Sequence, residues 1–190
     1  MRIITGSARG INLKTLEGDD TRPTPERVKE AVFSSIQFDI AGKTMLDLFA
    51  GSGQMGLEAL SRGAEKVTFV DASRDAVNIV TENAKKAKLY QHSNVLCMDW
   101  RSYITAAGGR SRFDYIYLDP PYALRLLPEV LISLYDSDMI ADDGTVICED
   151  ERPLEVEENV MLSARYETIK SVKYGRVHIT YLKPKTGEEE

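Results

Sequence analysis

A buried-type apolar run that ends in closely spaced glycines constrains this chain of 190 residues more than any other feature. The run 45–49 is followed by Gly51, Gly53 and Gly56, and an amphipathic run begins at Leu57. This succession is typical of a parallel strand, a tight turn and a helix start. Glycines let backbone N–H groups approach a ligand closely, and the helix N-terminus adds a partial positive charge. We therefore expect a ligand to bind at this turn.

The three glycines alone do not identify the ligand. With Asp71 twenty positions after Gly51, they fit a dinucleotide fingerprint. Asp47 shifts the balance, because a carboxylate in a central strand is costly to bury without a partner and would repel a pyrophosphate. The sulfonium and ammonium groups of S-adenosylmethionine would be attracted, and Asp71 could accept its ribose hydroxyls. The pattern favours S-adenosylmethionine over NAD, and a turn that serves packing alone stays open.

Composition and charge place the chain among ordinary soluble domains. It is 43% hydrophobic and 28% charged, and no apolar run approaches the roughly 20 residues that span a bilayer. The amino end lacks a signal-peptide segment. Cys97 and Cys148 have neither CxxC spacing nor flanking histidines, so we expect a cytoplasmic protein with no metal site and no disulfide.

The distribution of charge says more than its sum. A net charge of −6 argues against a protein that coats nucleic acid through bulk charge. Residues 1–16, however, contain Arg2, Arg9 and Lys14 without an acidic residue, whereas residues 149–158 contain six acidic residues. Any contact with phosphate is therefore expected to be local and near the amino end.

The alternation of apolar and amphipathic runs predicts the fold class. Strands are expected at 44–49, 66–71, 94–98, 114–119 and 144–149, and helices at 54–62, 73–89, 100–107 and 123–136. Nearly all-apolar strands joined by helices predict an α/β fold with a doubly wound, mostly parallel, Rossmann-like sheet of seven strands. Runs 166–174 and 176–182 would complete it as an antiparallel C-terminal hairpin.

Two further segments flank this core. A small β-hairpin is expected from runs 2–5 and 11–15, followed by a helix that starts with Thr24 as N-cap and Pro25 at its first position. The expected organisation is an extension at 1–43, a catalytic domain at 44–184 and a polar tail at 185–190.

A second constellation, Asp119-Pro120-Pro121-Tyr122, follows the run 114–119. Two prolines cannot continue a helix or donate to a strand ladder, so the chain should leave the sheet at Asp119. In open α/β sheets, ligands bind at this end of the strands. The turn offers a carboxylate, the Pro120 carbonyl and an aromatic ring, although a plain Pro-Pro turn capped by an aspartate stays open.

These groups suit a planar base that carries an amino group. The lone pair of such an amine is delocalised into the ring, and two acceptors that hold its hydrogens can localise it on nitrogen. Methyl transfer then needs positioning and electrostatics and no strong base. The ring of Tyr122 would stack on the base and hold it out of its own stack.

Together the two constellations resemble the class I S-adenosylmethionine-dependent methyltransferases that modify amino groups of bases. Three features make the chain similar to the bacterial RsmD family, which methylates guanine-966 of 16S ribosomal RNA at N2: the stretch Arg22-Pro-Thr-x-x-Arg27-Val, the stretch from Gly51 to Ala64, and Tyr174-Gly175 in the closing hairpin. The resemblance runs from about residue 1 to residue 184. Gln54 and Met55 depart from it, since such turns more often have small or apolar residues there.

The resemblance implies a role for each matching residue. At the cofactor, S-adenosyl-L-methionine, it implies Asp47, Ala50, Gly51, Gly53, Asp71, Ala72, Asp99 and Trp100. At the target guanine it implies Asp119, Pro120, Pro121 and Tyr122. The candidates for RNA contact are Arg2, Arg9, Lys14, Arg22, Thr24 and Arg27, although Arg22 and Thr24 fit the cofactor's carboxylate side equally. Trp100 fits a core position as well as a cofactor lid.

The expected partner is 16S ribosomal RNA within the assembled small subunit, bound by a monomer away from any membrane. An adenine-N6 methyltransferase is the nearest alternative, although such enzymes generally need a target-recognition domain and 68 residues follow Tyr122. A nicotinamide oxidoreductase would likewise need a substrate domain. A non-catalytic RNA-binding module would leave Asp47 and Asp119 without a reason.

Overall fold

The structure, a computed structural model, describes residues 1–16 and 24–185. Contacts divide the chain into two compact units, Met1–Trp100 and Arg101–Glu190. This division follows contact density, so the boundary expected between residues 43 and 44 remains a prediction.

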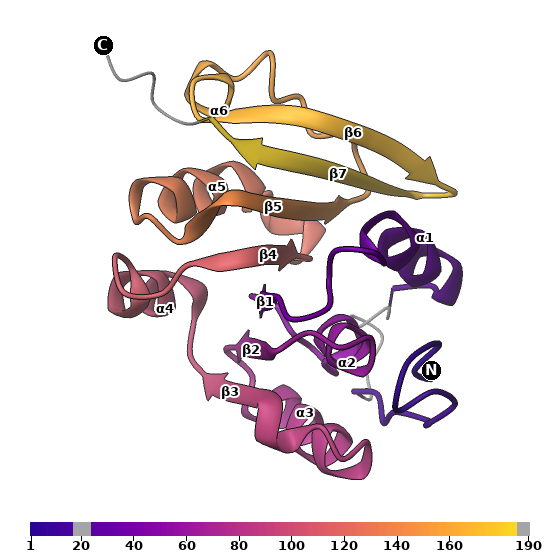
Figure 1. The fold of residues 1–190 in the computed structure, drawn as a ribbon. Helices are drawn as coiled ribbons and strands as arrows, with labels where there is room; N and C mark the ends of the chain where they lie inside the picture. The colour runs from indigo at the N-terminus through magenta and orange to yellow at the C-terminus, as the bar shows by residue number, and fades with distance from the viewer. Residues whose placement is uncertain (17–23, 186–190) are drawn as a thin grey trace. The chain divides into compact units, whose positions relative to one another are not determined.

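The first unit contains three parallel strands and the helices that follow them (Figure 1). The strands are β1 (Thr44–Asp47), β2 (Lys66–Asp71) and β3 (Ser93–Cys97), in the order β3-β2-β1. The helices are α1 (Glu26–Ile36), α2 (Gln54–Ser61), α3 (Arg74–Lys86) and the short η1 (Tyr90–His92), and α4 (Trp100–Ala107) begins at the last residue of the unit. Because the strands are parallel, their carboxyl ends lie at the same end of the sheet, and the last residues there are Asp47, Asp71 and Cys97.

The second unit contains four strands in the order β4-β5-β7-β6. They are β4 (Phe113–Leu118), β5 (Ile140–Asp150), β6 (Tyr166–Tyr174) and β7 (Val177–Pro184). Strands β4 and β5 are parallel, whereas β7 is antiparallel to both β5 and β6. The helical segments are η2 (Tyr122–Leu124), α5 (Leu127–Asp136) and α6 (Val160–Ser163). The expected antiparallel C-terminal hairpin is therefore present.

The strands that were predicted from apolar runs are buried. Four consecutive residues of β2 and four of β4 are buried, as strands covered on both faces require. Helix α2 is buried along its whole length, so it cannot present a polar face to solvent. The glycine turn thus lies between two elements that packing holds in place.

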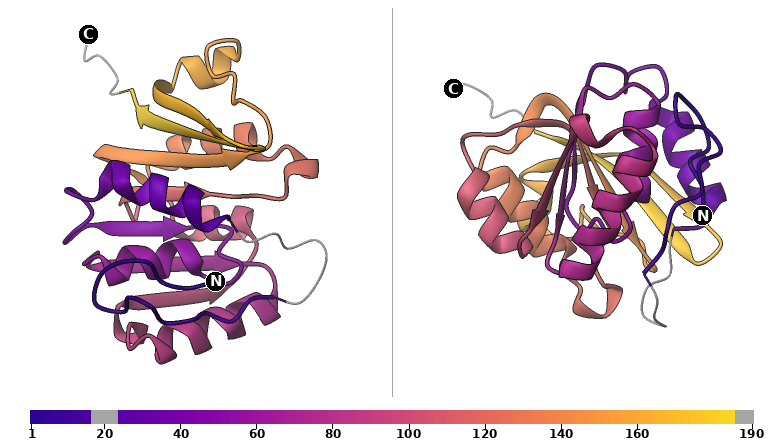
Figure 2. Two further views of the ribbon diagram at one scale, coloured as in Figure 1. Left: turned by 90° about the vertical axis from the view of Figure 1, so that its right-hand side faces the viewer. Right: turned by 90° about the horizontal axis from the view of Figure 1, so that it is seen from below.

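The amino-terminal arm, residues 1–16, forms the small antiparallel hairpin expected from the sequence: backbone hydrogen bonds of 2.9 and 3.0 Å flank an antiparallel bridge between Arg2 and Asn12. Other backbone groups of the arm bond to a helix, since the N–H groups of Ile4 and Thr5 donate to the Glu58 carboxylate in α2. Figure 2 shows the arm running along α2 and α3. Side chains of the helices therefore hold the short hairpin in place.

Two helix boundaries differ from the pattern. Helix α1 begins at Glu26 with Pro25 at the N-cap, one residue later than the expected cap at Thr24. The run 123–136 divides into η2 and α5, because Arg125 has a left-handed backbone (φ 48°) and the new helix has Pro128 in its first turn. The described helices include none that is long and apolar enough to cross a membrane.

Candidate active site

The glycine turn of the first unit uses its own amide groups internally. The N–H of Gly51 donates to the Asp71 carboxylate at 2.8 Å, and the N–H of Gly53 donates to the Ala50 carbonyl at 2.7 Å. The N–H of Gly56 donates to the Asp47 carboxylate at 3.1 Å. A pyrophosphate needs such N–H groups for itself. The turn is therefore poorly suited to a dinucleotide, which the sequence pattern alone left open.

Two of the glycines are required by geometry. Gly51 has φ 53°, with open space where a Cβ would point, so the backbone there can lie directly against a ligand. A Cβ on Gly56 would lie 2.2 Å from the ring of Phe69, so this glycine permits close packing of α2 on β2. The spacing thus serves ligand access at one end and packing at the other.

Asp47 is a buried carboxylate at the end of β1. Its residue is 2% exposed, and burial raises the pKa of its side chain to about 7, with a further upward contribution from Asp71. The hydrogen bond from Gly56 acts in the opposite direction. A cation bound nearby would favour the ionised carboxylate. The electrostatics of the turn therefore favour a cationic ligand over a phosphate.

Asp71 holds the end of β2 and remains partly accessible. One carboxylate oxygen accepts the N–H of Gly51, and the other accepts the N–H of Ser73 at 2.8 Å. Each oxygen keeps a further lone pair. Asp71 can therefore accept ribose hydroxyls while it holds the glycine turn in place.

The candidates for the adenine end follow β2 and β3. Asp71 pairs with Cys97 in the register of these strands, and the N–H of Met98 donates to the Asp71 carbonyl at 2.9 Å. Asp99 is therefore close to Asp71 in the fold, and both Ala72 and Asp99 are exposed. Trp100 is 7% exposed at the start of α4, which is the core position allowed by its sequence. Contacts of these three residues with a cofactor remain predictions.

The residues around the turn fit S-adenosylmethionine. Asp47 offers a buried negative charge, Asp71 offers acceptors, and Gly51 leaves open space. Gln54 adds an observation of its own, because its Oε1 is buried and has no hydrogen-bond partner among the residues that the structure describes. An unpaired buried acceptor is costly, and a ligand ammonium group would satisfy it. This residue departs from the family pattern, and its role could not be read from the sequence.

Asn83 is a residue that the sequence analysis missed. It is fully buried in α3, accepts the N–H of Lys14 at 2.8 Å and donates to the carbonyls of Lys14 and Ser52, both at 3.0 Å. Ser52 lies between the first two glycines of the turn. One amide therefore connects the amino-terminal arm to the glycine turn. A buried asparagine on an otherwise apolar helix face was the signal available in the sequence.

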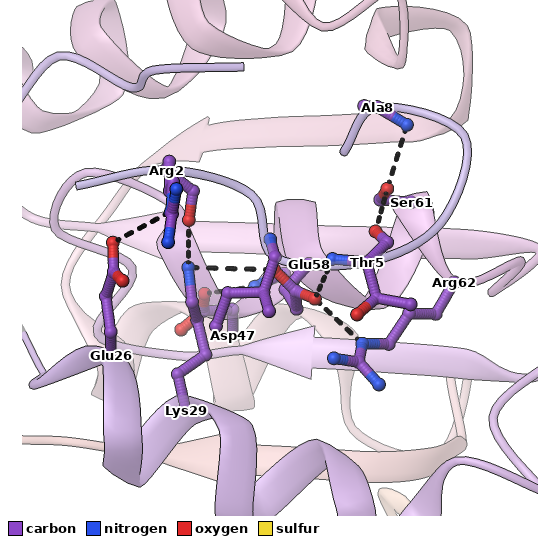
Figure 3. A network of polar contacts seen from close by, with 11 residues as sticks. Arg2, Thr5, Ala8, Glu26, Lys29, Asp47, Glu58, Ser61 and Arg62 are labelled. Carbon is purple, nitrogen blue, oxygen red and sulfur yellow. Dashed lines mark hydrogen bonds and ion pairs between the residues drawn. The ribbon is translucent and has the colours of Figure 1, made fainter. Parts of the chain in front are cut away.

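A buried ion pair attaches the arm to the same unit (Figure 3). Lys29 of α1 and Glu58 of α2 lie 3.6 Å apart with fully buried side chains, and Lys29 Nζ donates to the Arg2 carbonyl at 2.6 Å. Arg62 Nε donates to Glu58 at 2.8 Å. Burial lowers the pKa of Lys29, and the charge of Glu58 opposes that shift. The network holds the arm, α1 and α2 together.

The Asp-Pro-Pro-Tyr turn of the second unit leaves the sheet where the sequence predicts. Strand β4 ends at Leu118, and Asp119 and Tyr122 are both partly exposed, whereas Pro120 is buried and Pro121 exposed. The Tyr122 hydroxyl donates to the Glu149 carboxylate at 3.0 Å. Burial and the nearby carboxylates raise the pKa of Tyr122, so its hydroxyl stays protonated. The sequence analysis did not identify Glu149.

A cavity of about 710 Å³ lies beside Tyr122 within the second unit. Four acidic residues line it together with two arginines: Asp150, Glu151, Glu155, Glu158, Arg125 and Arg152. Clustered carboxylates disfavour a phosphate. The cavity therefore suits the donor edge of a base better than a nucleic-acid backbone.

The candidates for RNA contact differ in their ion pairs and in their exposure to solvent. Arg2 pairs with Glu26 at 3.6 Å, and Lys14 pairs with Glu82. Arg9 and Arg27 are exposed, on the arm and on α1. Thr24 is 4% exposed, and Arg22 lies outside the described residues. RNA contacts by these residues remain predictions.

We expect Asp71→Ala to weaken binding of S-adenosylhomocysteine by about 1.5–3 kcal/mol, the range for hydrogen bonds to a charged group. The substitution removes acceptors for ribose hydroxyls and also the partner of the Gly51 N–H. Calorimetric titration measures the change. Asp75→Ala in the first turn of α3 removes the same charge from an exposed position and should bind like the parent. Unchanged affinity in Asp71→Ala would show that the ribose binds elsewhere.

Comparison with known proteins identifies the family. The chain matches the family described as Conserved hypothetical protein 95 over residues 1–183. It is 40% identical to YlbH of Bacillus subtilis, over 88% of this chain and 93% of that protein. It is 33% identical to Ribosomal RNA small subunit methyltransferase D of Haemophilus influenzae, over 84% of each chain. The solved structure of yhhF from Escherichia coli matches with a TM-score of 0.84 and 28% identity, over 98% of each chain.

These matches confirm three predictions. The fold class is the mostly parallel seven-stranded α/β fold of class I methyltransferases with antiparallel C-terminal strands. The predicted resemblance to the RsmD family is confirmed, and so is S-adenosyl-L-methionine as the cofactor of such a methyltransferase. The chain belongs to the family described as Conserved hypothetical protein 95, the RsmD family of methyltransferases.

Proposed function

We propose that this protein transfers a methyl group from S-adenosyl-L-methionine to the N2 amine of a guanine in 16S ribosomal RNA, in the cytoplasm. The observation that supports it most is the Asp119–Tyr122 turn after β4, in a chain that is 33% identical to a small-subunit methyltransferase. The cofactor supplies an electrophilic methyl group when it is bound.

The residues of the chain have separate tasks in this proposal. Asp119 and the Pro120 carbonyl accept hydrogen bonds from the amine. These hydrogen bonds localise the lone pair of the amine on its nitrogen. Tyr122 stacks on the base and keeps it out of its own stack. Asp47 and Asp71 hold the cofactor by charge and hydrogen bonds. Catalysis then rests on position and electrostatics.

Methyl transfer from tritiated S-adenosylmethionine to purified small subunits and to total RNA tests the proposal. Digestion of the RNA to nucleosides should place the label in N2-methylguanosine. Label in N6-methyladenosine would support the alternative base, and the absence of label from both substrates would contradict the proposal. Binding of NADH in place of S-adenosylhomocysteine would support the oxidoreductase instead.

We also propose that the substrate is RNA already folded into the small ribosomal subunit, bound by a monomer. The basic surface that can meet phosphate is small, and ion pairs with Glu26 and Glu82 already engage Arg2 and Lys14. Three to five phosphate contacts give a log–log salt slope of roughly −2 to −3.5. That is weak for the capture of a free, flexible RNA, which also loses entropy when it is ordered. A preformed particle would present the base already accessible.

We expect faster methylation of purified small subunits than of protein-free 16S RNA at the same salt concentration. Arg9→Glu should slow the reaction on subunits, because it reverses an exposed charge on the arm. Lys170→Glu, an exposed charge reversal on β6, is the matched control and should react like the parent. An equal or faster reaction on naked RNA would overturn the particle proposal, and an unaffected Arg9→Glu would remove the arm from it.

A further inference from the structure

Glu149 is a buried carboxylate that two tyrosine hydroxyls share. It lies near the end of β5 with 2% of its surface exposed. The hydroxyl of Tyr117 donates to its Oε2, and the hydroxyl of Tyr122 donates to its Oε1 at 3.0 Å. A buried carboxylate is costly unless hydrogen bonds satisfy it, and such charge-assisted bonds are stronger than neutral ones. Glu149 therefore binds both phenols firmly.

The strands place Glu149 at the level of the Asp-Pro-Pro-Tyr turn. In the parallel register of β4 and β5, Leu118 pairs with Cys148, and the next residues along the two strands are Asp119 and Glu149. On its other side, Glu149 pairs with Ile179 of β7. A strand with neighbours on both sides is a rigid support. Glu149 therefore gives the partly exposed end of the turn a fixed hydrogen-bond acceptor.

The ring of Tyr122 depends on the hydrogen bond to Glu149 for its orientation more than the ring of Tyr117 does. Tyr117 is 1% exposed inside β4, where packing fixes its ring. Tyr122 is partly exposed and starts the three-residue η2, with no side-chain cap and a left-handed Arg125 at its end. Its hydroxyl bond to Glu149 is thus the described polar contact that fixes the direction of the ring. This gives the hydroxyl a role beside the stacking expected of the ring.

On the basis of the proposed function, we infer that Glu149 is a positioning residue, which sets the ring of Tyr122 at the angle that stacks on the target base. The carboxylate itself does not contact the reacting atoms in this proposal. Loss of the bond leaves the ring free to turn about its side-chain torsions. A misplaced stacking partner lowers the fraction of bound substrate in reactive geometry, so the effect should fall on kcat.

Kinetics of four variants on small subunits test this inference. We expect Glu149→Leu and Tyr122→Phe each to lower kcat about tenfold, with the KM for S-adenosylmethionine unchanged. The double variant should be no slower than either single variant, because both remove the same bond. Tyr117→Phe is the matched control: it removes the other hydroxyl from the same carboxylate and should keep kcat within about twofold of the parent. Multiplied effects in the double variant, or an equal loss in Tyr117→Phe, would overturn the inference.

A spectroscopic measurement keeps the inference testable without activity. In protein labelled with 3-fluorotyrosine, the Tyr122 signal is identified by its loss in Tyr122→Phe. We expect this signal to move toward the free-tyrosine position in Glu149→Leu and to stay in place in Glu167→Leu, which replaces an exposed glutamate of β6. An unmoved signal would contradict the inference whether or not the parent methylates RNA. A parent that is inactive but shows the expected shift would contradict the proposed function alone.

Discussion

Asp119→Ala is expected to reduce methyl transfer by at least about a thousandfold while the affinity for S-adenosylhomocysteine stays near that of the parent. Asp119 directly follows β4 and is partly exposed, and in the proposed function its carboxylate accepts a hydrogen bond from the substrate amine. An interaction that strengthens as the lone pair localises stabilises the transition state more than the bound cofactor. Removal of one such electrostatic group typically costs 10²–10³ in rate, and the carboxylate also positions the amine.

Tritium transfer to small subunits and calorimetric binding of S-adenosylhomocysteine measure the two effects of Asp119→Ala separately. Asp143→Ala removes an aspartate from an exposed part of β5 and should leave both quantities unchanged. Turnover near the parent rate in Asp119→Ala would remove this residue from the mechanism. A parallel loss of cofactor binding would instead place Asp119 at the cofactor.

Glu58→Ala is expected to lower the free energy of unfolding by about 3–5 kcal/mol, the largest stability effect that we predict. The substitution leaves the Lys29 ammonium buried without its partner. It also removes the acceptor of the Ile4 and Thr5 amide groups and of Arg62. A buried charge loses its ion-pair partner and two amide groups lose their acceptor in one step, so the arm should loosen where it contacts α2, while Asn83 still holds it at Lys14.

Urea unfolding followed by circular dichroism and by the fluorescence of Trp100, the single tryptophan of the chain, measures this effect. Glu82→Ala is the matched control, since it removes a glutamate that pairs with a lysine at the surface and should cost less than about 1 kcal/mol. Lys29→Met should fall between the two, because Glu58 keeps Arg62 and two amide donors. A loss in Glu58→Ala as small as that in Glu82→Ala would show that the network contributes little.

Local patterns in the sequence determined the elements and the identity of the chemistry. Strand β2 and strand β6 begin and end where their apolar and β-prone runs predict, because burial on both faces or a half-buried edge leaves a direct mark on residue choice. The glycine turn, Asp47, Asp71 and the Asp-Pro-Pro-Tyr segment were likewise readable, since each needs particular residue types at short spacing.

Interactions between residues far apart in the chain were decided by the tertiary structure. Glu58 forms a hydrogen bond with Ile4, 54 positions away in the sequence. Asn83 does so with Lys14 over 69 positions, and Glu149 with Tyr122 over 27 positions. A buried charge or amide looks like a surface residue in a one-dimensional pattern, because its partner is set by packing and not by periodicity. The same reason applies to the arm: its runs predicted the hairpin, but they did not indicate that a side chain of α2 would accept two of its amide groups. Sequence thus determined which chemistry the chain contains, and the tertiary structure decided which side chains support it, because polar groups in a core must find partners wherever the fold brings them.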